Sequence, residues 1–304
     1  MPNYLDIYKE LKKVKTAKTL KNEPLSRHTT LRVGGPADIL VIPKDVGALK
    51  DVLSITNSIK KYIIGNGSNL LIPDRGLRGI VIKMSGGINS FDCNGRYVTV
   101  GSGTLLQALI RRLASLGLSG LEFSAWVPAA IGGAIVMNMG AFGEEVGDIV
   151  EYAEILDAGG ELMKLSKSDL KFSYRKSNIK DCILISSKLK MNYRQKHVIN
   201  KRIEEIIAKR KELQPMSAPS AGSVFKNPKD VPAGKLIDMA GCKGLRVGGA
   251  EVSKKHANFI INLGDAKSSD VNTLIRKVKN TVKEKFKVKL ELELVDSSKL
   301  NMLF

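Results

Sequence analysis

Three glycine-rich turns hold the groups best suited to binding an anion. The first, residues 64–71, reads IGNGSNLL and directly follows a short apolar stretch. Its glycines would let backbone N–H groups approach a phosphate, and Asn66, Ser68 and Asn69 could add side-chain hydrogen bonds. The turn has neither the Gly-Lys-Ser/Thr of a P-loop nor the spacing of a dinucleotide fingerprint. Taken alone, it is equally consistent with a plain strand-to-helix turn.

The other two turns differ in character. Residues 127–141 are small, apolar and uncharged, which suits the close approach of a flat ligand or a diphosphate, although tight core packing would explain them equally well. Residues 221–228 either form a capped polar turn or offer an anion the hydroxyl of Ser223 and the donors of Lys226 and Asn227. The loops 64–71 and 127–141 could each bind a phosphate or diphosphate, and two such loops in one chain favour a nucleotide-type cofactor. They do not identify the cofactor.

Two charged residues further along the chain could also take part in chemistry. Arg175 lies among aromatic and hydroxyl residues in the segment 172–177. Glu293 lies in the segment 288–295, where apolar and charged residues alternate, and this alternation predicts a strand whose charged face points to solvent. The residues alone give no reason to separate Glu293 from Glu291.

Alternating strands and helices would position these residues. Asp45 is expected to cap a helix that continues to Ile59, and Thr104 to cap an amphipathic helix that ends at Gly117. The expected strands are 62–64, 79–84, 97–100, 153–157 and 182–193. From about residue 198 the pattern changes to a basic helix (198–213), a linker (214–219), a helix (233–240), a strand (257–262) and a long helix from Ser268 or Ser269 to Phe286. A length of 304 residues suggests about two domains.

Composition narrows the class of protein. The formal net charge of +19 would attract anions such as nucleic acids, anionic lipids or phosphorylated small molecules, but a solvated basic surface is the simpler explanation. A nucleic-acid binder would show salt-sensitive binding and no bound chromophore. The sequence has no zinc-finger, KH or RNP-type motif, so no nucleic-acid partner is expected.

Other functional classes are excluded by the same means. No apolar run approaches the roughly 20 residues that span a bilayer, so membrane insertion is not expected. The three cysteines are isolated and the three histidines are widely separated, which argues against a metal site and favours a cytoplasmic location.

Taken in order, the motifs form a set that resembles the UDP-N-acetylenolpyruvoylglucosamine reductases (UDP-N-acetylmuramate dehydrogenases), flavoenzymes of bacterial peptidoglycan precursor synthesis. The matching blocks run from residue 28 to about 295, and together they are far more specific than any one of them. They are HTTLRVGGPAD (28–38), IGNGSNLL (64–71), GGA and MNMGAFG (132–143), YRKS (174–177), PSAGSVFKNP (219–228), and GGAEVS to HANF (248–259).

The resemblance implies an α+β fold and a division into three parts. Residues 1–84 and 85–197 would form two subdomains of an FAD-binding domain of the vanillyl-alcohol-oxidase (PCMH) type, and residues 198–304 an α+β substrate domain. Little room is left between Arg175 and Ser223 for the tyrosine-bearing insertion found in some members. The chain therefore resembles the shorter subclass, and it is expected to act as a monomer.

The resemblance also implies the chemistry and its residues. NADPH would reduce a non-covalently held FAD, and the enolpyruvyl ether of UDP-N-acetylglucosamine would then receive the hydride. Arg175 would stabilise the developing carboxylate charge, Ser223 would donate the proton, and Glu293 would share hydrogen bonding to the enolate. The implied substrate-binding residues are Tyr174, Lys226, Asn227, Arg246 and His256. The implied FAD-binding residues are Arg32, Gly65, Asn66, Gly67, Ser68, Asn69, Leu70, Pro128, Ala129, Gly132, Gly133, Ala134, Asn138, Gly140 and Ala141.

The chain departs from the family pattern at four positions. Trp126 and Lys287 stand where relatives usually have glycine, Ala130 where they often have a hydroxyl residue, and Leu292 where proline is common. A strand slipped by two residues would give the role of Glu293 to Glu291. A different flavoenzyme of the same fold, which oxidises an alcohol or a sugar lactone, remains the alternative and would not need Arg175, Ser223 and Glu293 together.

Overall fold

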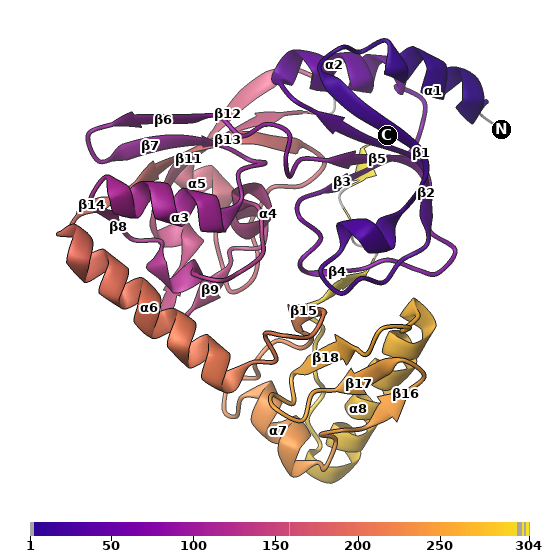
Figure 1. Ribbon diagram of the computed structural model, residues 1–304, viewed down its shortest axis with the longest axis vertical. Helices are drawn as coiled ribbons and strands as arrows, with labels where there is room; N and C mark the ends of the chain where they lie inside the picture. The colour runs from indigo at the N-terminus through magenta and orange to yellow at the C-terminus, as the bar shows by residue number, and fades with distance from the viewer. Residues whose placement is uncertain (1–2, 158, 297–299, 301, 304) are drawn as a thin grey trace.

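The protein consists of three α+β units that follow one another along the chain. The computed structural model describes residues 3–157, 159–296, 300 and 302–303. Figure 1 shows the first unit (indigo) at the upper right, the second (purple to pink) at the left and the third (orange to yellow) at the lower right, grouped around a common centre. The expected α+β class is confirmed by this architecture.

A five-stranded mixed sheet with the strand order β1-β2-β5-β3-β20 forms the first unit. Its strands are β1 (Ala17–Pro24), β2 (Pro36–Pro43), β3 (Lys61–Ile64), β5 (Leu77–Lys83) and β20 (Met302–Leu303). Strands β2 and β5 pair in parallel and are almost wholly buried, as their apolar sequences require. Helices α1 (Tyr4–Lys12) and α2 (Val46–Ile55) lie together over this sheet (Figure 1). The Asp45 cap of α2 is confirmed, since its Oδ1 accepts the N–H of Ala48 at 2.7 Å.

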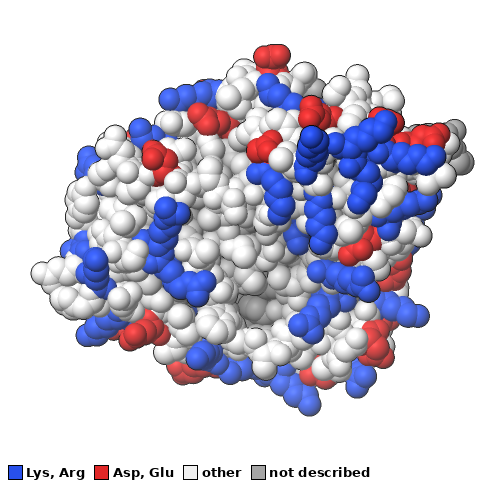
Figure 2. Space-filling view, turned by 45° about the horizontal axis from the view of Figure 1, so that its top comes forward, with Lys and Arg blue, Asp and Glu red and all other residues white. Residues whose placement is uncertain are grey.

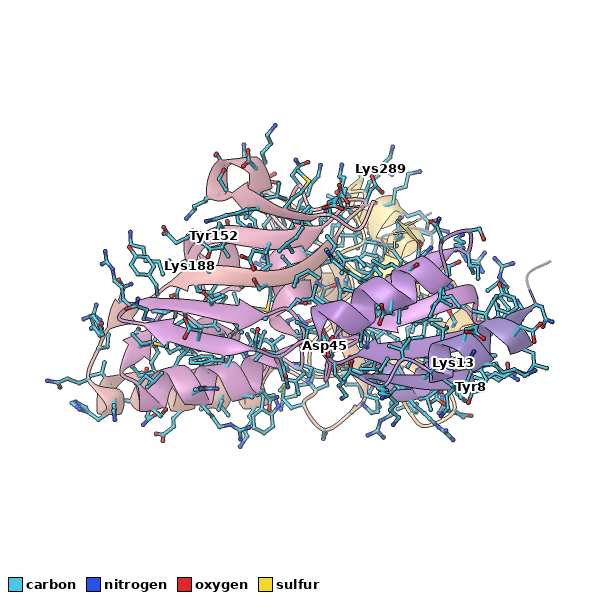
Figure 3. All side chains as sticks on the ribbon, turned by 90° about the horizontal axis from the view of Figure 1, so that it is seen from above. Tyr8, Lys13, Asp45, Tyr152, Lys188 and Lys289 are labelled. Carbon is cyan, nitrogen blue, oxygen red and sulfur yellow. The ribbon has the colours of Figure 1, made fainter. Side chains whose placement is uncertain are left out.

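The second unit has an antiparallel sheet with the strand order β12-β11-β13-β7-β6. Its strands are β6 (Phe91–Asn94), β7 (Tyr97–Gly101), β11 (Val150–Leu156), β12 (Leu162–Ser166) and β13 (Ile183–Lys190). Helices α3 (Leu106–Ser115) and α4 (Ile131–Val136) pack on one face and share a core with it. On the other face the Lys188 Nζ lies 5.8 Å from the centre of the Tyr152 ring, and Figure 3 shows both side chains on this sheet.

The third unit has the strand order β15-β18-β17-β16. Its elements are β15 (Ser220–Ser223), α7 (Ala233–Met239), β16 (Arg246–Val247), β17 (Ala250–Val252), β18 (Phe259–Asn262) and α8 (Ser268–Phe286). The apolar stripe predicted for α8 is buried against the sheet and α7, which confirms the predicted buried face. The helix also begins at Ser268, as predicted. Among the described residues, no helix combines the length and the apolar character that a bilayer span requires.

The remaining elements connect or complete these units. They are η1 (Leu25–His28), β4 (Leu70–Leu71), β8 (Leu118–Ser119), η2 (Glu122–Ser124), β9 (Gly140–Ala141), β10 (Glu144–Glu145), η3 (Val146–Asp148), α5 (Lys167–Leu170), β14 (Asn192–Tyr193), α6 (Lys196–Leu213) and β19 (Val295–Asp296). The long helix α6 packs against α3 and η2, and its Ile206 belongs to the core of the second unit. The division expected at residue 198 therefore falls inside a helix that packs with the second unit.

Three local expectations were wrong. Helix α2 ends at Ile55 and does not continue to Ile59. Thr104 does not cap α3, because the helix begins one residue later than expected, after Leu105, while the carbonyl of Thr104 accepts the N–H of Ile131. Residues 288–295 do not form a continuous strand. Instead Leu292 makes an isolated bridge to Phe225, and only the last residue of the segment belongs to β19. The segment finds partners in loops rather than in a neighbouring strand, so no ladder forms.

Lys and Arg side chains are spread over the face of the molecule shown in Figure 2. In Figure 2, Lys and Arg side chains surround a central area of uncharged residues on the face shown. The basic residues therefore do not form one continuous patch on this face, and the simpler explanation of the +19 charge as solvated surface fits this distribution.

Candidate active site

A cavity of about 870 Å³ lies where the three units meet. Its walls come from loop 64–70 of the first unit, residues 126–142 of the second and residues 218–223 of the third. Arg175 and Glu293 also line it. A cavity of this size, with a mostly apolar lining and a few polar groups, is typical of a site for a small molecule or a cofactor.

The loop 64–71 presents backbone donors to this cavity. It leads from β3 into the short strand β4, so the strand-to-helix turn considered from the sequence is not what forms. Among the described residues, none accepts a hydrogen bond from the backbone N–H groups of residues 66–69. Gly67 has a φ of +67°, and a Cβ there would lie 2.1 Å from the carbonyl oxygen of His28. A run of unpaired N–H groups on a glycine-containing loop forms an anion-binding concavity, so the loop fits a diphosphate.

The opposite wall combines tight packing with open space. A Cβ on Gly132 would approach the Cβ of Ser102 to 2.7 Å, whereas a Cβ on Gly133 would meet nothing within 4 Å. Gly132 therefore packs α4 against the core, and Gly133 exposes backbone to the cavity. Asn138 lies outside the cavity, because its side chain is buried between the carbonyl of Ser173 and the N–H of Gly147. The wall offers the close backbone approach that a flat ring requires, and thus fits a flavin.

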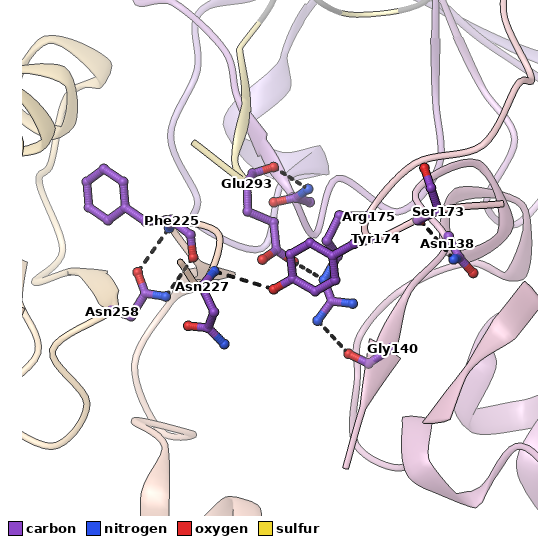
Figure 4. A network of polar contacts seen from close by, with 10 residues as sticks. Asn138, Gly140, Ser173, Tyr174, Arg175, Phe225, Asn227, Asn258 and Glu293 are labelled. Atoms are coloured by element: carbon purple, nitrogen blue, oxygen red, sulfur yellow. Dashed lines mark hydrogen bonds and ion pairs between the residues drawn. The ribbon is translucent and has the colours of Figure 1, made fainter. Parts of the chain in front are cut away.

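Arg175 and Glu293 form an ion pair inside the cavity, although they are 118 residues apart in the sequence. The Arg175 Nε donates to the Glu293 Oε1 at 2.8 Å, and its Nη2 donates to the carbonyl of Gly140 at 2.8 Å (Figure 4). The two side chains are 17% and 18% exposed. Arg175 also has a φ of +56°, a conformation that is uncommon for a side chain of this kind. Such backbone strain occurs at functional sites, where it aims a side chain.

Burial dominates the electrostatics of Glu293. Desolvation raises the pKa of its carboxyl group above the usual range, and this effect outweighs the lowering by Arg175 and Lys226. A raised pKa favours the protonated form of a carboxyl group, and that form can donate a hydrogen bond. The side chain of Glu291 is 78% exposed, lies near Lys226 and does not line the cavity. Geometry therefore favours Glu293 over Glu291, and the expectation from alternation that Glu293 faces solvent was wrong.

Ser223 connects this cavity to a smaller one. It lines both the large cavity and a second cavity of about 340 Å³, which Asn227, His256 and Lys243 also line. Its hydroxyl group forms no hydrogen bond with the described residues and is free to meet a ligand. Burial lowers the pKa of His256, which favours the neutral ring.

Of the remaining expected substrate residues, Asn227 and His256 line the smaller cavity with Ser223, whereas Tyr174, Lys226 and Arg246 line neither cavity. The Tyr174 hydroxyl accepts the backbone N–H of Asn227 at 3.4 Å, which joins the second unit to the third (Figure 4). The Lys226 Nζ lies 3.9 Å from a carboxylate oxygen of Glu291. Arg246 is exposed on β16, donates to the carbonyl of Gly248, and lines neither cavity.

Several residues that line the large cavity were not predicted as site residues from the sequence. Phe142, Arg210 and Met216 are examples, and Trp126 was noted only as a departure from the family pattern. Phe142 and Trp126 adopt φ angles of +55° and +69°, as Arg32 and Arg175 do at +57° and +56°. A positive φ angle at a residue other than glycine cannot be recognised from the residue type. The only sequence feature that pointed to these cavity-lining residues was the high density of glycine around them.

Comparisons with known proteins agree with this geometry. A family model described as an FAD binding domain matches residues 37–166, and one described as the C-terminal domain of UDP-N-acetylenolpyruvoylglucosamine reductase matches residues 214–295. The reductases of that name from Bacillus licheniformis and Bacillus subtilis are each 42% identical to this chain, over 94% of it and 96% of their own length.

A solved structure points to the same family. The crystal structure of UDP-N-acetylenolpyruvylglucosamine reductase from Thermus caldophilus has a TM-score of 0.80 and 39% identity, and covers 92% of this chain and 98% of its own. The FAD-binding domain with a C-terminal domain of the reductase type, expected from the resemblance, is therefore confirmed. The cavity, the loops that line it and these similarities lead to one conclusion: the chain belongs to the UDP-N-acetylenolpyruvoylglucosamine reductase family.

Proposed function

We propose that this chain catalyses the NADPH-dependent reduction of UDP-N-acetyl-3-O-(1-carboxyvinyl)glucosamine to UDP-N-acetylmuramate, a step of peptidoglycan precursor synthesis. Its cofactor is FAD. The observation that carries the assignment of residues is the meeting of Arg175, Glu293 and Ser223 at one cavity, from three segments far apart in the sequence. An enzyme that oxidises an alcohol would have no use for this combination.

FAD, when bound, would supply the hydride chemistry between NADPH and the methylene carbon of the enol ether. The unpaired N–H groups of residues 66–69 would hold its diphosphate, and the backbone around Gly133 would contact its ring. Pro128, Ala129 and Gly140 line the same wall. The fit of both walls to one elongated ligand supports these roles.

The residues around the substrate would stabilise the developing charge and donate the proton. Hydride addition to the methylene carbon pushes electron density toward the carboxylate, where Arg175 would stabilise the negative charge and Glu293 would donate a hydrogen bond. The α-carbon then takes a proton from the hydroxyl of Ser223, and a C–H bond forms on each carbon of the former double bond. Serine is a weak acid, so the high basicity of the carbanion provides the driving force.

The sugar nucleotide would extend from Ser223 into the smaller cavity. Asn227 and His256 line that cavity, and the Tyr174 hydroxyl contacts the backbone of Asn227, which supports roles for these three in binding the phosphates or the sugar. Lys226 lines neither cavity, so its proposed role rests on the family resemblance alone. The position of Arg246 outside both cavities gives its proposed role no such support. We also propose that the enzyme acts as a monomer in the cytoplasm, and the three free cysteines support the cytoplasmic location.

The Ser223→Ala variant tests the proposal. Reduction of the flavin by NADPH should proceed at the wild-type rate, because the hydroxyl group has no part in it. Reoxidation by the enolpyruvyl substrate should slow by about 10²- to 10⁴-fold, the usual contribution of a general acid. Stopped-flow absorbance of the flavin separates the two half-reactions. An equal loss of both rates would contradict the role of Ser223, and a wild-type enzyme that the enolpyruvyl substrate does not reoxidise would contradict the function itself.

A further inference from the structure

Trp126 has no role in the proposed reaction, yet its position is costly. It is the only tryptophan of the chain, it lines the large cavity, and its side chain is 41% exposed. Its φ of +69° lies in the left-handed region, which suits glycine and strains any residue with a Cβ. A half-exposed ring on a strained backbone adds little packing to the free protein. Its benefit must therefore come from something that contacts the ring from the cavity side.

Two cations from the end of α6 lie beside the aromatic residues of this rim. The Lys211 Nζ is 5.6 Å from the centre of the Trp126 ring, within the range of a cation–π contact. The Arg210 guanidinium is 5.3 Å from the centre of the Phe142 ring, and both of these residues line the cavity. The Arg210 Nη2 also donates to the carbonyl of Phe123, three residues before Trp126. The cavity rim thus combines flat apolar rings with positive charges.

Arg210 provides an independent sign that an anion binds here. It is only 8% exposed, and its buried Nε–H has no hydrogen-bond acceptor among the described residues. No carboxylate in the described part of the chain forms an ion pair with it. A buried guanidinium without an anion is expensive, and burial lowers the pKa of this group accordingly. A ligand that brings an anionic group to the cavity would remove that cost.

We propose that Trp126 is a stacking platform for the heteroaromatic ring of a nucleotide whose phosphates interact with Arg210 and Lys211. Rings of this kind stack on tryptophan without regard to base identity, and guanidinium groups bind phosphates through paired hydrogen bonds. The inference rests on the proposed function, which brings two such nucleotides to the cavity in turn: NADPH and the UDP-sugar. Both carry the same chemistry, and kinetics can distinguish them.

Steady-state kinetics of the holoenzyme with FAD at saturation tests the platform. Trp126→Ala should raise the KM of at least one nucleotide by about 5- to 100-fold, the range expected for loss of one base–aromatic stack, with a smaller change in kcat. Trp126→Phe keeps a ring and should recover most of the affinity. Tyr193→Ala is the control, because Tyr193 is 65% exposed and lines neither cavity.

The nucleotide whose KM rises identifies the source of the stacked ring. If the KM for NADPH and the KM for the UDP-sugar both stay within twofold of wild type in Trp126→Ala, the proposal is wrong, even where the overall reaction is normal. A loss confined to FAD content would also overturn it. Failure of the wild-type enzyme to turn over the UDP-sugar would instead count against the proposed function, so the two ideas fail separately.

The charge component has its own matched pair of variants. Lys211→Gln should raise the same KM and weaken its dependence on salt, whereas Lys209→Gln, an exposed neighbour outside the cavity lining, should not. The single tryptophan adds a direct signal. Titration of the oxidised holoenzyme with NADP⁺ or with UDP should change the Trp126 emission saturably for the nucleotide identified by kinetics. An emission that is indifferent to both would contradict stacking.

Discussion

The side-chain amide of Asn69 donates a hydrogen bond to the backbone carbonyl of Glu293 at 3.0 Å. The N–H of Val295 donates in turn to the carbonyl of Asn69, and the N–H of Glu293 to the carbonyl of Val224. The loop that offers its N–H groups to a diphosphate therefore also sets the position of the candidate catalytic carboxyl group. Cofactor binding and the placement of Glu293 are mechanically linked through one asparagine.

Glu293→Gln should impair only the second half-reaction. The amide keeps the size of the side chain but cannot form the ion pair with Arg175 or serve as an acid, so reoxidation by the enolpyruvyl substrate should slow by about 10²-fold or more. Flavin reduction by NADPH should stay within about threefold of wild type. Glu291→Gln is the matched control, since that side chain is exposed. A larger effect from Glu291→Gln than from Glu293→Gln would assign the catalytic role to Glu291 instead.

The raised pKa of Glu293 predicts a pH dependence of reoxidation. If the protonated carboxyl group donates to the enolate, the apparent second-order rate constant should fall as pH rises through that pKa. Lys226 lowers the pKa of Glu293, so Lys226→Gln should shift the falling limb to higher pH. Lys229→Gln should not shift this limb, because Lys229 is exposed and is not among the charged groups that shift the pKa of Glu293. A limb that moves to lower pH in Lys226→Gln would contradict the prediction.

The same shift affects stability. Because the folded-state pKa of this carboxyl group lies above its unfolded value, its contribution to the free energy of unfolding is fully present below the unfolded pKa and is lost as pH rises through the folded pKa. Glu293→Gln should accordingly flatten this part of the pH profile of stability, measured by urea unfolding.

Gly133→Ala should separate folding from cofactor binding. Position 133 is inside α4, and a Cβ there meets no protein atom within 4 Å, so the substitution should stabilise the apoprotein by about 0.5–1 kcal/mol. The new methyl group projects into the cavity, and the FAD dissociation constant should rise by about 5- to 100-fold. Gly47→Ala, in α2 and outside the cavity lining, should not weaken FAD binding. Flavin titration and urea unfolding measure the two quantities.

Lys287→Gly should stabilise the third unit. Lys287 follows the last turn of α8 with a φ of +60°, a conformation that costs a residue with a Cβ about 1–2 kcal/mol and glycine much less. The free energy of unfolding should rise by about 1 kcal/mol in a urea titration. Lys283→Gly, inside the same helix, should lower it by about 1 kcal/mol. A destabilised Lys287→Gly variant would show that the cost of the unusual φ is already offset.

The sequence predicted the features that depend on neighbouring residues. The Asp45 cap, the buried stripe of α8 and the end of α3 at Gly117 all follow from local spacing, and all are confirmed. Helix α1 and the hairpin of β1 and β2 were not predicted, because their apolar periodicity is weak or continuous. Thr104 was expected to cap a helix. Instead its carbonyl accepts the N–H of Ile131 at the start of α4, a contact between distant segments that local spacing does not predict.

The candidate site depends on contacts that local patterns do not contain. Alternation correctly separates buried Leu290 and Leu294 from exposed Glu291, but it places Glu293 on the wrong side, since Arg175 reaches it from another unit. Only the resemblance to a family selected Glu293. The positive φ angles that aim Arg175 and Trp126 at the cavity likewise arise from tertiary packing, which no short-range rule predicts.

The first and third units are joined at several separate points. Asp74 accepts the N–H groups of Ser268 and Ser269 at the start of α8, and the Thr30 hydroxyl donates to the carbonyl of Ser220. Strand β19 adds two paired residues to β4. Any swing of the third unit away from the first would break all of these bonds together. Large nucleotides therefore enter and leave the cavity through movements of loops and side chains at its entrance. A hinge motion between the first and third units is not expected.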